Sequence, residues 1–120
     1  MKLFYSLFVL IFAFSSCTYD QAEKNAFDAL ACDTSNVRYS VEIKNILETS
    51  CKNCHFGDAA EGAGKKLDSY VEVKKYVDQN KLLESVLRTG DNYMPLGGNR
   101  LSACKIEQIR NWIKKGAPNN

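Results

Sequence analysis

The chain has 120 residues, enough for one small domain, and its 45% hydrophobic and 25% charged residues are ordinary for a soluble fold. Sixteen basic and 14 acidic residues leave a formal charge of +2, so nothing in the charge indicates a nucleic-acid partner. The pairs Lys65-Lys66, Lys74-Lys75 and Lys114-Lys115 are interpreted as solvated faces, with a docking patch for an acidic partner as the alternative.

The first residues predict export. A short positive start, MK, precedes an apolar run over residues 3–14, which is short for a membrane span but suits a signal peptide. The following FSSC resembles the lipobox of bacterial lipoproteins, although Phe14 stands where leucine is usual. This resemblance implies cleavage before Cys17 and acylation of Cys17, and a plain secretory signal is the alternative. We therefore expect a signal peptide over 1–16, a tether over 17–36 from lipidated Cys17, and a domain over 37–120. The lipid-anchored domain would face the periplasm or the cell surface of a bacterium.

Helical periodicity predicts an all-α domain of about four short helices. We expect helices over 41–49, 70–78, 81–88 and 103–115, with N-caps at Ser40, Ser69 and Ser102 and with Gly90 ending the third. Glycine-containing loops over 57–64 and 91–100 separate them, and no alternating strand pattern is evident. The side chains expected to face the interior are Val41, Ile43, Ile46, Leu47, Val73, Tyr76, Val77, Leu82, Leu83, Val86, Leu87, Ile106, Ile109, Trp112 and Ile113.

The segment Cys51-Lys52-Asn53-Cys54-His55 is a C-x-x-C-H motif that contains the only histidine of the chain. A closed zinc site needs four ligands, and no second cysteine or histidine pair follows. A redox dithiol normally opens a helix after a strand, whereas a predicted helix precedes this motif. Covalent haem attachment explains the spacing, because two thiols bond to the haem and the next residue presents an imidazole to the iron. Export and the small size of the domain favour haem as well.

Met94 is the candidate for the opposite face of the iron. No second histidine exists, and loss of Met1 with the signal leaves Met94 as the only methionine. It lies in the loop YMPLGG, where Pro95 fixes the backbone and the glycines allow a close approach to a porphyrin. A buried core methionine, with an open sixth position on the iron, is the alternative.

These features resemble a mono-haem class I cytochrome c module, over about residues 40–118. The resemblance rests on the helix before the motif, the motif, Met94-Pro95, and the tail Trp112-Ile113-Lys114-Lys115-Gly116-Ala117-Pro118. It implies one covalent haem c, ligated by His55 and Met94, with the first and last helices crossing. Two departures are a missing proline between His55 and Met94, so that another carbonyl must orient His55, and Lys105 where a capping box would place an acid.

Cys32 and Cys104 remain, and in an oxidising compartment a left-over pair usually forms a disulfide, with two free thiols as the alternative. A His/Met iron has no open position for substrate, so we expect an electron carrier that exchanges electrons with exported or membrane-bound redox proteins, and no enzyme. The alternatives are a haem-based sensor or peroxidase-like enzyme with a labile sixth position, and a lipoprotein in which the haem is purely structural.

Overall fold

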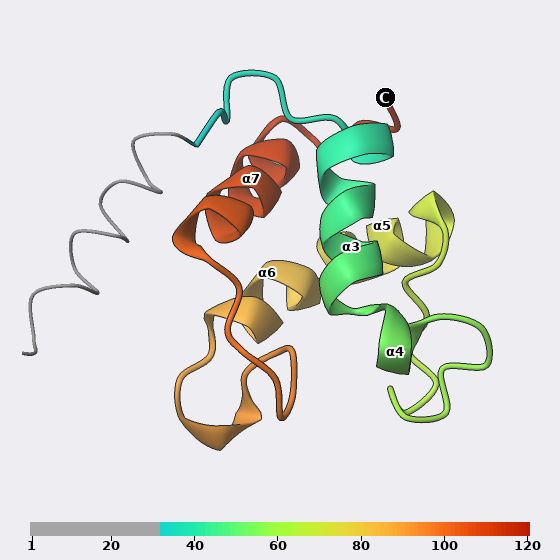
Figure 1. Ribbon diagram of the computed structural model, residues 1–120. Coiled ribbons are helices and arrows are strands. Elements are labelled where there is room, and N and C mark those ends of the chain that lie inside the picture. Colours follow the sequence, from blue (N-terminus) through green and yellow to red (C-terminus); the bar gives the residue numbers. More distant parts are fainter. Residues whose placement is uncertain (1–31) are drawn as a thin grey trace, which may run out of the picture.

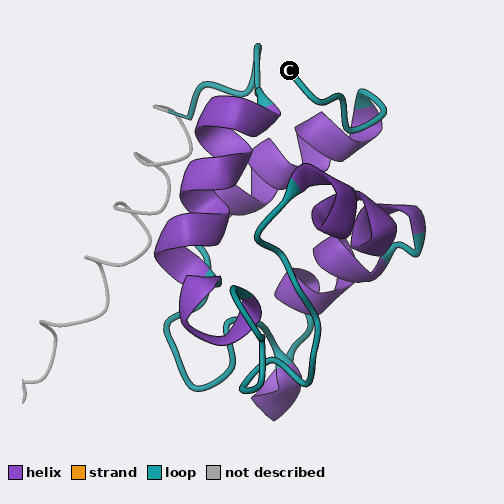
Figure 2. Cartoon of the chain, turned by 90° about the vertical axis from the view of Figure 1, so that its right-hand side faces the viewer, coloured by secondary structure: helices purple, strands orange, loops and turns teal. Residues whose placement is uncertain are grey.

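The computed structural model describes residues 32–120, which form helices joined by loops (Figures 1 and 2). The all-α class is therefore confirmed for these residues. The expected signal peptide, the lipobox with Cys17, and residues 17–31 of the expected tether lie outside them. Among the described residues, no helix has the length and apolar character needed to cross a membrane. The elements in chain order are η2 (Tyr39–Ile43), α3 (Lys44–Ser50), α4 (Lys52–His55), α5 (Tyr70–Asp78), α6 (Lys81–Leu87), η3 (Gly90–Asn92) and α7 (Ala103–Lys114).

The first predicted helix begins earlier than expected and starts with a π-helical turn. The turn η2 continues directly into α3, and within it the Ile43 N–H bonds to the Arg38 carbonyl at 3.2 Å. A π turn holds more residues than an α turn, so it shifts the apolar face before α3 begins. Ile43 is fully buried as expected, but Val41 is 44% exposed, and its assignment to the interior was wrong.

The N-terminus of this helix is capped from the far end of the chain. Ser40 lies inside η2 and caps nothing, so the predicted cap was wrong. The N–H groups of Tyr39 and Ser40 instead donate to the side-chain and main-chain oxygens of Asn120, at 2.9 and 2.8 Å. The Arg38 N–H donates to the Glu42 carboxylate at 2.7 Å. Asn120 and the Glu42 side chain thus satisfy N–H groups that a helix leaves without partners at its start.

Helices α5 and α6 follow their predicted bounds closely. The Ser69 hydroxyl accepts the Glu72 N–H at 3.3 Å, which confirms this cap. Helix α6 ends at Leu87, before the predicted stop, and Gly90 with φ +76° opens η3 instead. Leu87 was expected to be buried but is 41% exposed, because it occupies the last position of the shortened helix. The residues of these helices that are buried as expected are Val73, Val77, Leu82 and Val86.

Helix α7 carries the apolar face that the sequence predicts, and it anchors the chain's tail. Ser102 caps it by accepting the Lys105 N–H at 3.3 Å. Trp112 is fully buried, and its indole N–H donates to the Pro118 carbonyl at 2.9 Å. The tail beyond α7 therefore turns back over the core and reaches the start of η2, as the position of the C-terminus in Figure 1 shows.

The core joins the two ends of the described chain. η2 packs against α7, and α6 packs against both α5 and α7. The Tyr39 ring lies edge-on to Tyr70, with centroids 5.0 Å apart, and 5.8 Å from the ring of Trp112. The disulfide predicted between Cys32 and Cys104 is present, and it fastens the segment before η2 to the first turn of α7.

Candidate functional site

The three chemically distinctive residues of the motif share one helical turn. Cys51 lies at the break between α3 and α4, with φ −121° and ψ −21°. Its carbonyl accepts the N–H groups of Cys54 and His55 at 3.3 and 3.0 Å. Residues three and four apart are neighbours on a helical turn, so Cys54 and His55 both follow Cys51 by about one turn.

The two thiols of the motif differ in their exposure. Both are free, but Cys51 is partly buried against the core whereas Cys54 is exposed. Burial raises the pKa of the Cys51 thiol from 9.0 to about 11, which outweighs the opposing effect of the nearby Lys105 ammonium. The Cys51 thiol is therefore neutral at pH 7.

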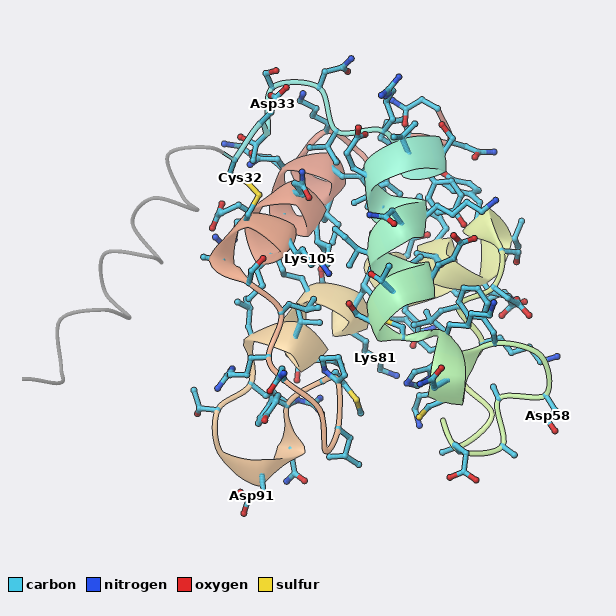
Figure 3. The ribbon with its side chains drawn as sticks, viewed as in Figure 1. Cys32, Asp33, Asp58, Lys81, Asp91 and Lys105 are labelled. Atoms are coloured by element: carbon cyan, nitrogen blue, oxygen red, sulfur yellow. A yellow bond between two sulfur atoms is a disulfide. The ribbon has the colours of Figure 1, made fainter. Side chains whose placement is uncertain are left out.

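Lys105 belongs to this neighbourhood, although the sequence alone did not place it there. Its side chain extends from α7 toward the end of α3 (Figure 3), with Nζ 3.4 Å from the hydroxyl of Ser50. Ser50 directly precedes Cys51, so the ammonium of α7 lies beside the motif. In the sequence, Lys105 is notable only because it stands where a capping box would place an acid. Its contact with Ser50 could not be predicted, because it depends on how α3 and α7 pack together.

His55 is oriented by a backbone carbonyl. Its Nδ1 lies 2.7 Å from the carbonyl oxygen of Lys65. A carbonyl can only accept, so Nδ1 must carry the proton, and Nε2 keeps a lone pair that can bind a metal ion. The sequence predicts that some carbonyl orients His55, and the structure identifies that carbonyl.

The loop between α4 and α5 returns to the motif to deliver this carbonyl. The Leu67 N–H donates to the His55 carbonyl at 2.8 Å, and Leu67 is buried. Within the loop, the Lys65 N–H donates to the Gly62 carbonyl at 3.1 Å, which closes a turn immediately before the Lys65 carbonyl. The sequence predicts a loop with three glycines here, but it does not show that this loop folds back onto His55.

Met94 lies on a separate loop that is fixed to α6. Its N–H donates to the Ser85 carbonyl at 3.0 Å, and its side chain is partly buried against the core. The same loop is braced by the Tyr93 hydroxyl, which donates to the Gly98 carbonyl at 3.0 Å, and by the Arg100 guanidinium 4.6 Å above the Tyr93 ring. This loop and α4 both lie at the lower end of the molecule in Figure 1.

The structure thus gathers Cys51, Cys54 and His55 on one turn, and it holds Met94 on a different loop. Cys32 and Cys104 are paired at the start of α7, apart from the motif. Within residues 32–120, no three His, Cys, Asp or Glu side chains are grouped in a way that could by themselves hold a metal ion. Comparison of the chain with protein-family models, with curated proteins and with solved structures gives no match.

Proposed function

We propose that this protein is a c-type cytochrome that carries single electrons. The observation that carries the proposal is the motif turn itself. It carries two free thiols and one imidazole, and the bond from His55 Nδ1–H to the Lys65 carbonyl leaves Nε2 available to a metal. That donor set would suit covalent attachment of a haem, with the imidazole available to its iron.

The residues present fit a haem in their chemistry. Cys51 and Cys54 are the thiols that would form the thioether bonds, and they are kept separate from the disulfide that joins Cys32 to Cys104. His55 would bind the iron through Nε2, and Met94 would supply a thioether sulfur. When bound, the haem supplies the one-electron Fe(III)/Fe(II) couple. The finer fold that goes with this proposal is that of a class I cytochrome c.

The protein's own residues have definite tasks under this proposal. The Lys65 carbonyl holds the His55 ring in one tautomer and one orientation. The Ser85 carbonyl and the Tyr93 brace hold the backbone around Met94, which favours a persistent sixth ligand over an open position. The buried side chains of α3 and α7 keep water from the side of the motif that faces the core.

The proposed location is a bacterial membrane, with the chain anchored through lipid on Cys17 and facing the periplasm or the cell surface. Its partners would then be exported or membrane-bound redox proteins. Support comes from the apolar run, the lipobox-like FSSC, and a disulfide of the kind that oxidising compartments preserve.

Absorption spectra of the purified protein, with and without carbon monoxide, test the proposal. We expect a low-spin spectrum in both oxidation states, no rapid binding of carbon monoxide, and a reversible one-electron wave at an electrode. The variant Met94→Leu should bind carbon monoxide rapidly. A high-spin wild-type spectrum with rapid carbon monoxide binding would instead indicate a sensor or peroxidase-like protein, and a low-spin haem without a reversible wave would indicate a structural role.

A further inference from the structure

Gly62 differs from the other glycines of the loop between α4 and α5. Gly57 and Gly64 have φ values of +68° and +70°, and a Cβ on either would meet no atom within 4 Å. Gly62 has no such φ, but a Cβ there would lie 2.3 Å from the Cys54 carbonyl oxygen and 2.5 Å from His55 Nδ1. At Gly57 and Gly64 glycine eases the backbone conformation, whereas at Gly62 it leaves room for the Cys54 carbonyl and the His55 ring.

This close approach is coupled to the hydrogen bond that orients His55. The Gly62 carbonyl accepts the Lys65 N–H at 3.1 Å, so the turn that begins at Gly62 presents the Lys65 carbonyl to the imidazole. Gly62 is buried against the ring, and its N–H is fixed to the Ala59 carbonyl at 3.0 Å. A side chain at position 62 would push this turn away from His55 and carry the Lys65 carbonyl with it.

We propose that Gly62 is a positioning residue for the iron-binding imidazole, acting through the Lys65 carbonyl. Because Gly62 has no side chain, the loop can contact the His55 ring, and the Lys65 carbonyl then fixes the Nδ1–H tautomer. It also sets the reduction potential, and this second part rests on the proposed function. An Nδ1–H that donates to a carbonyl makes the imidazole a stronger electron donor, which favours Fe(III) and lowers the potential.

The experiment compares Gly62→Ala with Ala60→Ser, using the full ¹⁵N-labelled chain as purified and in its reduced state. His55 is the only histidine, so its ring signals need no assignment. Ala60→Ser adds one atom to the same loop at an exposed position and serves as the matched control. We expect the wild type and Ala60→Ser to show a protected Nδ1–H. Gly62→Ala should lose that protection, with proton exchange at least tenfold faster, and its potential should shift upward.

A second variant keeps the proposal testable if Gly62→Ala does not fold. Exchange of the peptide bond between Lys65 and Lys66 for an ester weakens the Lys65 carbonyl as an acceptor and adds nothing to the loop. The Lys66 N–H that is lost donates no hydrogen bond among the described residues. We expect faster Nδ1–H exchange and a raised potential in the ester variant, and failure of Gly62→Ala to fold would itself support the lack of room at position 62.

Two results would overturn the proposal. One is a folded Gly62→Ala variant with the same Nδ1–H protection and the same potential as Ala60→Ser. The other is an ester variant whose His55 signals and potential match those of the wild type. The tautomer readout does not require haem, so a chain that binds no haem would refute the proposed function while leaving the effect of Gly62 on His55 to be judged separately.

Discussion

The disulfide between Cys32 and Cys104 should stabilise the fold by restricting the unfolded chain. The perturbation is the double variant Cys32→Ser/Cys104→Ser, which removes the bond without leaving an unpaired thiol at either position. The closed loop spans 72 residues, and the chain-entropy relation gives about 4 kcal/mol for a loop of that length, an upper-end figure. The hydrogen bonds from this segment to α7 are exposed, such as Gln108 Nε2 to the Asp33 carbonyl at 3.4 Å, and add little.

Urea unfolding followed by circular dichroism measures the effect. The double variant should keep the helical spectrum, because neither cysteine belongs to the buried core. Its free energy of unfolding should fall by about 3–4 kcal/mol, and its m-value should rise, because the unfolded chain expands further without the cross-link. A loss of less than about 1 kcal/mol, at an unchanged m-value, would refute the reasoning that the bond acts on the unfolded state.

Three further predictions concern the core, the tail and the motif. Trp112→Phe removes part of a fully buried ring and the indole N–H that donates to the Pro118 carbonyl. Thermal or urea unfolding should show that the free energy of unfolding falls by about 2 kcal/mol, and an unchanged value would contradict this. Asn120→Ala removes the side-chain oxygen that accepts the Tyr39 N–H, and should cost about 1 kcal/mol in the same assay, whereas Asn119→Ala, at an exposed neighbour, should cost much less. In protein prepared without haem, burial raises the pKa of the Cys51 thiol from 9.0 to about 11. The neutral thiol therefore contributes about 2–3 kcal/mol to the free energy of unfolding below pH 9, and this contribution is lost as the pH rises through 11. The variant Cys51→Ala should lack this part of the loss of stability above pH 9. Identical plots of unfolding free energy against pH for the variant and the wild type would contradict burial of the thiol.

Local patterns were enough to predict most of the helices. The bounds of α5 match the sequence prediction, and those of α6 and α7 differ from it by one residue. The serine caps at 69 and 102 were also predictable, because a cap depends on residues within the next turn. The disulfide followed from the compartment and from the count of cysteines left over.

Features that depend on distant residues could not be predicted from local patterns. Ser40 had the right residue type for a cap, but Asn120 already satisfies the N–H groups at that helix start. Val41 fitted helical spacing, but the π turn placed it at the surface. The partner of His55 was expected to be a carbonyl, yet which one depends on how the loop after the motif folds back.

The mass of the intact protein, measured after denaturation and without reduction, tests the proposed covalent haem most directly. We predict that the wild-type protein retains the mass of one haem, that neither Cys51 nor Cys54 reacts with an alkylating reagent, and that Cys51→Ala/Cys54→Ala loses the haem on denaturation. A wild-type mass without haem, with two alkylatable thiols at Cys51 and Cys54 after production in a host that matures c-type cytochromes, would contradict the account.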